Sequence, residues 1–318
     1  MKTLIVGYGS IGQKHAKNLK KMGVSVAGFD INSFKTKLEE SYVSYCAGLS
    51  QEDIDAVLIC TPPSTHIELA LQALKSGKHV FIEKPLSNTY EGIDELMRIA
   101  KEKQLTVMVG YQMRYLAEIQ YIKRILKEKQ IGNIMSIQAN CGHYLPYWRP
   151  NTDYTKCYTS RSDLGGGTLL DCSHEIDYLM HLFGDIKDVF CNAGILSDLK
   201  VDVEDTADIL LHFKSGVFGN VHLDLTNQTY TRNCTIVGTE GTIFCDFKEH
   251  SVTIQKQNEE HKKVFSWQTD VYFAEMKDFI FYINDKRESE SNIQTAKATL
   301  DVALACKISA KVGKVIKI

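Results

Sequence analysis

A glycine-rich turn near the start of the chain constrains the fold most strongly. Residues 2–6 (KTLIV) form a short apolar run, and the turn GYGSIG that follows leads into a helical pattern. This is a GxGxxG motif in the strand–turn–helix context that the motif requires. Gly7 permits the tight turn, Gly9 lets the backbone approach a pyrophosphate, and Gly12 lets the helix pack close to the strand. We therefore expect a dinucleotide site at the helix N-terminus, formed by Gly7, Tyr8, Gly9, Ser10, Ile11 and Gly12.

An acidic residue after the next strand indicates which dinucleotide is bound. The run VSVAGFD ends at Asp30, about 20 residues beyond the turn, which is the spacing of an acid that binds the ribose 2′-hydroxyl. A carboxylate there repels a 2′-phosphate. The sequence therefore predicts NAD as the cofactor and disfavours NADP.

Strand and helix patterns continue to alternate through the first third of the chain. Apolar runs at 54–60, 79–83 and 105–112 are separated by amphipathic helical patterns. This βαβ order predicts a Rossmann-type, doubly wound parallel sheet of the α/β class, buried on both faces. Ligands of such sheets bind outside the carboxyl ends of the strands. The residues expected there are Thr61, Pro62, Pro63, Glu83 and Lys84 at the cofactor, and Arg114 at the substrate.

Length and composition limit the class of protein. The chain has 318 residues, which suggests two domains, and a net charge of −2, which does not favour a nucleic-acid partner. It has no run of 18 apolar residues, so we expect no membrane partner, and its N-terminus resembles a strand more than a signal peptide. Nine cysteines without CxxC spacing predict reduced thiols in a cytoplasmic protein, with no zinc or other metal site.

A second glycine-rich segment lies at residues 164–183 (LGGGTLLDCSHEIDYLMHLF). Its apolar residues repeat with helical period, which predicts one helix. Asp171, His174 and Tyr178 fall on the opposite face of that helix. A carboxylate and an imidazole one turn apart can share a proton, although such a face is often simply solvated.

The remainder of the chain alternates apolar and polar residues between tight turns. This pattern predicts a large, mostly antiparallel sheet with one buried and one open face, which together with the 164–183 helix forms an α+β domain. We expect a dinucleotide-binding domain at 1–118 and a substrate-binding and oligomerisation domain at 119–318, followed by two final helices.

An aromatic and basic loop precedes the glycine triplet. Aromatic faces suit sugar rings, and arginine suits carboxylate or phosphate groups. The loop is either a substrate-pocket wall or a segment anchored by its aromatic side chains. The candidate substrate-binding residues in it are Tyr144, Trp148, Arg149, Tyr158 and Arg161.

Four motifs together resemble the Gfo/Idh/MocA (glucose–fructose oxidoreductase/inositol dehydrogenase) family. They are the GxGxxG turn, TPPxxH at 61–66, EKP at 83–85, and the glycine triplet followed by Asp and His. The resemblance implies that Lys84 lies beside the nicotinamide and the substrate, and that the 61–63 turn flanks the nicotinamide. His66 also matches a family position near the cofactor. We expect it to help begin its helix and give it no catalytic role.

The resemblance extends to the catalytic residues and to assembly. His174 is the expected base, because its unperturbed pKa lies near neutrality. Asp171 would orient His174 or bind a hydroxyl, and Lys84 would polarise the reacting oxygen. The family commonly has Asp and His four positions apart, whereas Asp171 and His174 are three apart. Asp177 is interpreted as structural and Glu175 as solvent-facing. By resemblance, a homodimer or homotetramer forms through the open sheet face.

The expected reaction is hydride transfer between NAD and a secondary alcohol of a sugar, cyclitol or sugar-nucleotide. The 164–177 run and YLPYWRP upstream resemble the branch of bacterial surface-sugar pathways. The sequence leaves two alternatives open. One is another enzyme on the same fold, either an NAD(P)H-dependent reductase of an imine, dihydrodiol or tetrapyrrole or an enzyme that uses NAD transiently, and the other is a non-catalytic dinucleotide sensor. Fold alone excludes neither.

Overall fold

The computed structural model describes residues 1–32, 38–266, 270–285 and 289–318. The chain divides into two compact units. The first comprises residues 1–112 and 270–297, and the second comprises 113–269 and 298–318. A C-terminal segment therefore belongs to the first unit, and the division lies a few residues before the expected one.

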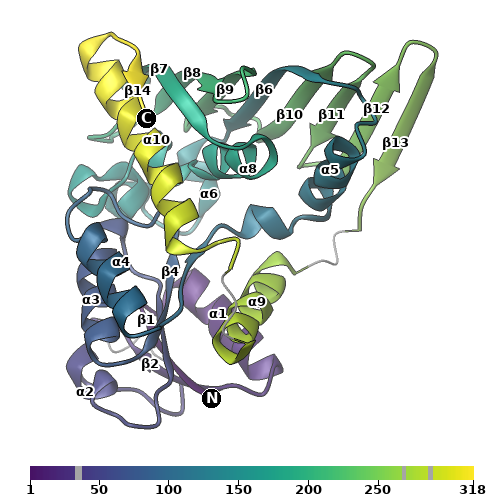
Figure 1. The fold of residues 1–318 in the computed structure, drawn as a ribbon. Coiled ribbons are helices and arrows are strands. Elements are labelled where there is room, and N and C mark those ends of the chain that lie inside the picture. Colours follow the sequence, from purple (N-terminus) through teal and green to yellow (C-terminus); the bar gives the residue numbers. More distant parts are fainter. Residues whose placement is uncertain (33–37, 267–269, 286–288) are drawn as a thin grey trace. The chain divides into compact units, whose positions relative to one another are not determined.

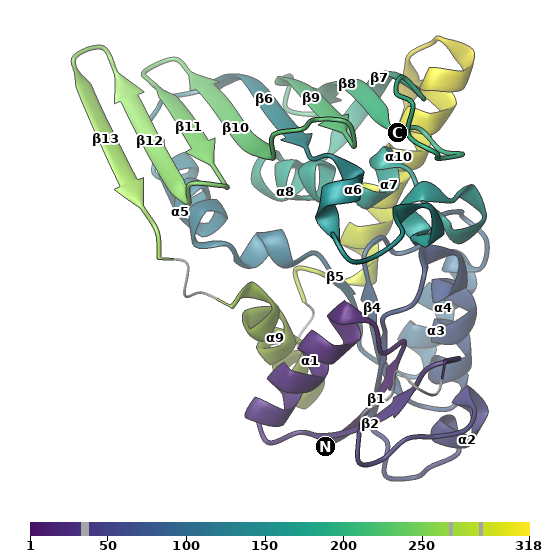
Figure 2. The same cartoon turned by 180° about the vertical axis from the view of Figure 1, so that it is seen from behind.

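The first unit contains a five-stranded parallel sheet in the order β2-β1-β3-β4-β5. This confirms the predicted Rossmann-type sheet. Helices α1 and α9 cover one face, and α3 and α4 cover the other (Figures 1 and 2). The strands are β1 (Lys2–Val6), β2 (Ser25–Phe29), β3 (Ala56–Ile59), β4 (His79–Glu83) and β5 (Val107–Gly110). The helices are α1 (Ser10–Lys21), α2 (Tyr45–Leu49), α3 (His66–Lys75), α4 (Ile93–Glu102) and α9 (Val271–Asp285), with the short 3-10 turn η2 (Pro63–Thr65).

The second unit contains a nine-stranded sheet in the order β13-β12-β11-β10-β6-β9-β8-β7-β14. Neighbouring strands are antiparallel except for β6 and β9, which run parallel because β6 lies between two meanders. This confirms a large, mostly antiparallel sheet. The strands are β6 (Ile134–Gly142), β7 (Ile186–Gly194), β8 (Thr206–Phe213), β9 (Phe218–Asp224), β10 (Thr231–Gly238), β11 (Thr242–Asp246), β12 (Ser251–Lys256), β13 (Glu259–Val264) and β14 (Ile316–Lys317).

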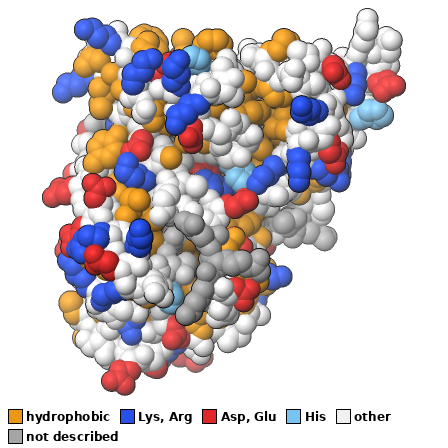
Figure 3. Space-filling model, viewed as in Figure 1, with side chains coloured by type: hydrophobic (Ala, Val, Ile, Leu, Met, Phe, Trp, Pro, Cys, Tyr) orange, Lys and Arg blue, Asp and Glu red, His pale blue; other side chains and the backbone are white. Residues whose placement is uncertain are grey.

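Helices of the second unit lie against one face of this sheet, as Figure 2 shows for α5, α7 and α8. They are α5 (Ala117–Lys127), α6 (Leu145–Trp148), α7 (Thr168–Asp171) and α8 (His174–Phe183), and the long α10 (Ile293–Val312) follows α9 in the chain. The other face keeps large apolar side chains exposed, among them Met135, Leu210, Phe218 and Phe244. Figure 3 shows apolar side chains at the margin where Figure 1 draws this sheet. The open face predicted from the alternating pattern is therefore present.

Candidate functional site

The turn between β1 and α1 has the shape that the glycine motif predicts. Gly7 has φ of +88°, and a Cβ there would lie 2.6 Å from the Cys60 carbonyl oxygen. A Cβ on Gly12 would collide with the Gly7 carbonyl oxygen. Gly9 differs from both, because a Cβ built on it meets no atom within 4 Å. Gly7 and Gly12 thus allow close packing, whereas Gly9 leaves open space where a ligand can approach the backbone.

The start of α1 suits an anion. Gly9 is the N-cap residue and provides no side-chain cap, and the first turn contains no acidic residue. The N–H groups at this end remain available to phosphate oxygens. Ser10 is exposed and Ile11 half-buried at the same end. These features fit the diphosphate of a dinucleotide.

Asp30 follows β2 and closes the same loop. Its Oδ2 accepts a hydrogen bond from the Tyr8 backbone N–H at 2.7 Å, and its Oδ1 accepts one from the Asn32 N–H at 2.8 Å. Tyr8 itself is buried, and burial raises the pKa of its hydroxyl. Asp30 therefore shapes the glycine turn in addition to any contact with a ribose.

The turn after β3 is held by its own side chains. The hydroxyls of Thr61 and Thr65 lie 2.7 Å apart, and the Thr65 hydroxyl donates to the Pro62 carbonyl at 2.8 Å. Pro63 begins the 3-10 turn η2 that leads into α3. His66 is the first residue of α3, as expected. It is fully buried, and its Nε2 lies 2.9 Å from the Thr61 carbonyl oxygen.

The strand end after β4 brings charged groups together. Lys84 is half-buried there. The preceding Glu83 lies with Oε1 2.6 Å from Nε2 of His15, a buried residue of α1. One potential ligand atom from each of His15, Glu83 and Glu275 lies within 4.8 Å of the others. Glu83 engages Nε2 of His15, and we assign no metal to this cluster.

In the second unit, the glycine triplet is required by close packing. Gly165 and Gly167 have positive φ (+81° and +105°), a conformation that glycine adopts readily. A Cβ on Gly166 would collide with the Tyr158 carbonyl oxygen, and one on Gly167 would collide with the Glu204 carboxylate. Glu204 also accepts a hydrogen bond from the Leu169 N–H at the start of α7, at 3.3 Å. The triplet thus lets the aromatic loop and Glu204 approach α7.

The predicted single helix over 164–183 is wrong, because α7 ends at Asp171 and α8 begins at His174. Asp171 and His174 therefore lie on either side of a break rather than on one helical face. Both are almost fully buried, and Tyr178 is buried completely with its ring against Phe247. The alternative of a simply solvated face does not hold.

Asp171 has two hydroxyl donors. Its Oδ1 accepts from the Tyr158 hydroxyl at 2.7 Å, and its Oδ2 accepts from Thr159 Oγ1 at 2.6 Å. The carboxylate is thereby fixed by the aromatic loop that the sequence placed beside it. Tyr158, expected to contact substrate, orients Asp171 in this structure.

Two ion pairs with fully buried carboxylates hold α8. Arg114 donates from Nε and Nη2 to both carboxylate oxygens of Asp177, at 2.8 and 2.6 Å, which agrees with a structural role for Asp177. These two bonds engage a guanidinium that the sequence analysis placed at the substrate. Glu175 is not solvent-facing, and that interpretation was wrong. It is fully buried and accepts two hydrogen bonds from Arg232, at 2.6 and 2.9 Å.

Neither member of the Glu175–Arg232 pair was predicted as important. Burial alone would lower the pKa of Arg232, but the Glu175 charge raises it well above the ordinary value. Arg232 begins the second meander, whose alternating pattern does not reveal that this position faces a helix. An arginine within a predicted strand, which needs a partner wherever its guanidinium leaves solvent, is the signal that sequence reasoning could have used.

The aromatic loop packs largely on itself. Tyr144 contacts Tyr147 edge to face with ring centroids 4.8 Å apart, and the Trp148 indole N–H donates to the His143 carbonyl at 3.0 Å. Arg149 is exposed, and Arg161 pairs with Asp163 on the surface. These contacts between its own side chains anchor the loop, and its role as a wall of the substrate pocket stays a prediction.

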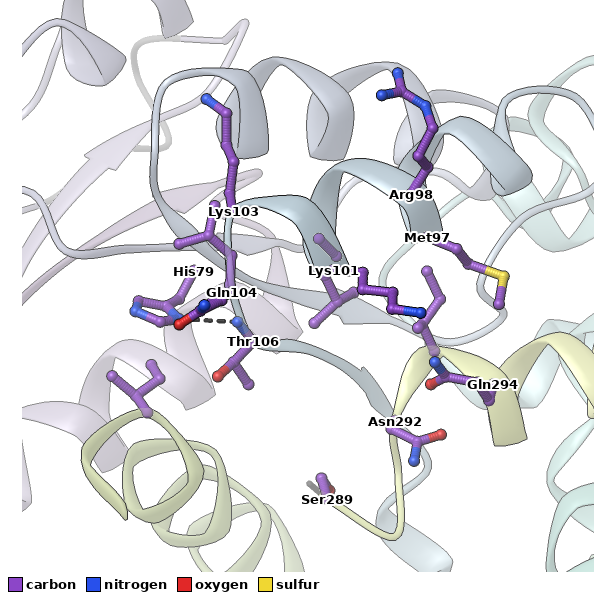
Figure 4. Close-up of a pocket in the computed structure, with 15 residues that line it drawn as sticks. His79, Met97, Arg98, Lys101, Lys103, Gln104, Thr106, Ser289, Asn292 and Gln294 are labelled. Carbon is purple, nitrogen blue, oxygen red and sulfur yellow. Dashed lines mark hydrogen bonds between the residues drawn. The ribbon is translucent and has the colours of Figure 1, made fainter. Parts of the chain in front are cut away.

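A hollow of about 910 Å³ lies at the opposite, amino ends of β4 and β5 (Figure 4). Its lining combines apolar side chains with basic and amide ones, and of the basic ones Arg98 pairs with Glu102 and Lys103 donates to the Lys75 carbonyl. Because parallel sheets bind ligands at their carboxyl ends, this hollow is not the candidate site. The nine cysteines are free thiols. Among the described helices, none has the length and apolar character needed to cross a membrane.

Comparison with known families agrees with this architecture in both units. A family model described as "Oxidoreductase family, NAD-binding Rossmann fold" matches residues 1–111, and the GFO/IDH/MocA C-terminal domain matches residues 119–244. The chain belongs to the Gfo/Idh/MocA family. It is thus a member of a family of NAD-binding oxidoreductases, which confirms the predicted enzyme class and cofactor.

Individual relatives align with part or all of the chain. Myo-inositol 2-dehydrogenase of Thermotoga maritima is 26% identical over 342 aligned positions, which cover 100% of this chain and 98% of the relative. 2,7-anhydro-N-acetylneuraminate hydratase of Escherichia coli is 30% identical over 205 positions, covering 63% of this chain and 54% of that protein. The structure of levoglucosan dehydrogenase with NADH and levoglucosan superposes with a TM-score of 0.90 at 20% identity, covering 100% and 99% of the two chains.

Proposed function

We propose that the protein is an NAD-dependent dehydrogenase that oxidises a secondary alcohol of a cyclic polyol or sugar. The observation that carries this proposal is the open backbone at Gly9, which lies at the uncapped N-terminus of α1. Gly9 follows β1, and Lys84 follows β4, which is two strands away from β1 in the same parallel sheet. The names of the relatives support the substrate class, since inositol and levoglucosan are both cyclic and rich in hydroxyl groups.

Each group of first-unit residues has a proposed part in holding NAD. The backbone of residues 7–12 would receive the diphosphate, and Asp30 would meet the adenosine ribose with the carboxylate lone pairs that its backbone contacts leave over. Thr61, Pro62, Pro63 and Glu83 would border the nicotinamide half. Tyr8, Ser10 and Ile11 contribute through their backbone positions in the turn. The Asp30 charge favours NAD over NADP.

The proposed chemistry separates the proton from the two-electron transfer. NAD, when bound, supplies the oxidant. Lys84 would donate a hydrogen bond to the reacting hydroxyl oxygen and favour its deprotonated form. His174 would accept the hydroxyl proton, and a neutral imidazole suits that role near pH 7. Asp171, fixed by Tyr158 and Thr159, would accept a hydrogen bond from a neighbouring substrate hydroxyl.

Substrate selection is assigned to the aromatic loop. Tyr144 and Trp148 offer ring faces to a sugar, and exposed Arg149 suits an anionic substituent, as in the sugar-nucleotides that the sequence favours. Arg161 pairs with Asp163 on the surface, and Arg114 pairs with Asp177 in the interior. We therefore assign both arginines a structural role in the second unit and not a contact with substrate. The exposed apolar side chains Leu210, Phe218 and Phe244 support assembly through the open sheet face.

The test is NAD⁺ reduction followed at 340 nm with inositols, levoglucosan, free sugars and sugar-nucleotides. We expect turnover with at least one class. Lys84→Ala or His174→Ala should lower kcat by about 10²- to 10⁴-fold, whereas the surface variant Lys101→Ala serves as the control and should not. Binding of NADH without turnover of any substrate in the panel would overturn the dehydrogenase proposal. Consumption of an anhydro-sugar without net NADH would instead indicate a hydratase-type reaction with transient oxidation.

A further inference from the structure

His66 joins two turns at the carboxyl end of the parallel sheet. Its ring is fully buried. Nε2 lies 2.9 Å from the carbonyl oxygen of Thr61, and Nδ1 lies 2.8 Å from the carbonyl oxygen of Pro85. The first carbonyl belongs to the turn after β3 and the second to the turn after β4, and these strands are hydrogen-bonded neighbours. One side chain therefore spans both turns.

The two turns differ in how they are held. The turn after β3 is fastened internally, because Thr65 bonds Thr61 and the Pro62 carbonyl through its hydroxyl and the same carbonyl through its N–H. In the turn after β4, Pro85 has no N–H to donate, so its carbonyl is the backbone polar group that it can offer. His66 meets that carbonyl and connects it to the fastened turn.

The connection between the two turns depends on the geometry of the imidazole ring. A neutral imidazole has one N–H and donates to one carbonyl, whereas an imidazolium donates to both. Burial lowers the pKa of His66, the two carbonyls and the Glu83 charge oppose that shift, and the Lys84 charge reinforces it. In either state the ring fills the space between the turns. An acyclic amide cannot place groups against both carbonyls in the same way.

We propose that His66 is a positioning residue that holds the Lys84–Pro85 turn against the 61–65 turn and so sets the location of the Lys84 amine. This rests on the proposed function, in which Lys84 polarises the reacting oxygen. His66 touches neither substrate nor reacting atoms in this scheme. It acts on the reaction through the carbonyl group of Pro85, the residue that follows Lys84.

The experiment compares His66→Gln and His66→Phe with a matched histidine variant, His79→Asn. His79 lies at the opposite end of β4 and also makes a backbone hydrogen bond, accepting from the Thr106 N–H at 3.0 Å. Hydrogen exchange by mass spectrometry would follow peptides covering residues 60–66 and 83–90. NADH affinity would be measured by fluorescence, and kcat with the best substrate in wild-type and Lys84→Ala backgrounds.

We expect faster exchange in both peptides for the His66 variants and no change there for His79→Asn. The value of kcat should fall about 10- to 100-fold, because small misplacements of a reacting group have effects of that size, while NADH affinity changes less than threefold. In the Lys84→Ala background, His66→Gln should lower kcat by less than twofold, since residues that act as one unit are not additive. If His66→Gln acted through a general loss of packing, it would lower kcat by the same factor in the wild-type and Lys84→Ala backgrounds.

Three results would overturn the proposal. Unchanged exchange in both peptides would remove the link between the turns. Faster exchange with unchanged kcat would remove the link to Lys84. An equal fall in kcat on His66→Gln in the Lys84→Ala background would show that His66 contributes only to packing. If wild type turns over no substrate, the proposed function fails, and the exchange measurement still decides whether His66 joins the turns.

Discussion

Arg114 and Asp177 form a two-point ion pair inside the second unit, with Nε to Oδ2 at 2.8 Å and Nη2 to Oδ1 at 2.6 Å. Their side chains are 6% and 0% exposed. Thr299 of α10 adds a third hydrogen bond to the same carboxylate at 3.1 Å. The pair therefore ties the segment before α5 to α8, whose first residue is His174, and the C-terminal helix bonds to the same carboxylate.

Breaking this pair should be strongly destabilising. Arg114→Met leaves the Asp177 charge buried without its main partner, which typically costs about 3–5 kcal/mol of unfolding free energy. Urea unfolding measures the loss. The matched control is Arg161→Ala, which removes an ion pair whose side chains are 45% and 58% exposed and should change stability by less than about 1 kcal/mol. Equal effects of the two variants would refute the assigned importance of burial.

Gly9 and Gly12 should respond differently to a methyl group. Gly9→Ala places Cβ in open space at a helix N-cap, so stability should change by about 1 kcal/mol or less. The same methyl would obstruct a diphosphate, and NADH affinity should fall about tenfold or more, equivalent to about 1.4 kcal/mol. Gly12→Ala forces Cβ against the Gly7 carbonyl and should lower stability itself. Unfolding curves and NADH titrations of both variants separate the two effects. Unaltered NADH binding by Gly9→Ala would argue against the proposal that the backbone of residues 7–12 receives the diphosphate.

Asp30 should be tested with a substitution that preserves the turn. Asp30→Asn keeps a carbonyl oxygen able to accept the Tyr8 N–H but removes the charge. We expect the ratio of kcat/KM for NAD over NADP to fall by about tenfold, since each 1.4 kcal/mol of lost repulsion changes the ratio by that factor. Asp30→Ala should lower both efficiencies as well, because the turn loses its acceptor. A preserved cofactor ratio in Asp30→Asn would take the carboxylate out of cofactor discrimination.

Most of the fold was predictable because its signals are local. The β4 strand was predicted with its exact observed bounds, since an apolar run between a glycine stop and a charged end leaves little choice. The alternating pattern that predicts the second sheet does not extend to β13, because its sequence, EEHKKV, has no apolar alternation and is exposed throughout. It pairs with β12 through backbone hydrogen bonds, which a side-chain pattern does not reveal.

The candidate site was predictable in its residues but not in its contacts. The periodic pattern of 164–183 concealed the break at Cys172 and Ser173 between α7 and α8, because apolar side chains on both helices face the same core. The break makes the three-residue spacing of Asp171 and His174 a poor guide to their angular separation. Glu175 was misplaced for a related reason. Its partner Arg232 lies 57 positions away in the sequence, and no local pattern links the two.

Stability should also depend on pH through His79. Partial burial lowers the pKa of His79 below its ordinary value of 6.5 in the folded chain, and its Nδ1 must stay unprotonated to accept the Thr106 N–H. The unfolded chain then binds more protons, so the contribution of His79 is complete above about pH 6.5 and is lost as pH falls through the folded pKa. One such group contributes at most about 1.4 kcal/mol per pH unit. His79→Asn, which keeps an acceptor but does not titrate, should flatten the change in urea midpoint between pH 7.5 and pH 5 relative to wild type. An identical pH dependence in the two proteins would show that His79 is not among the groups that couple folding to protons.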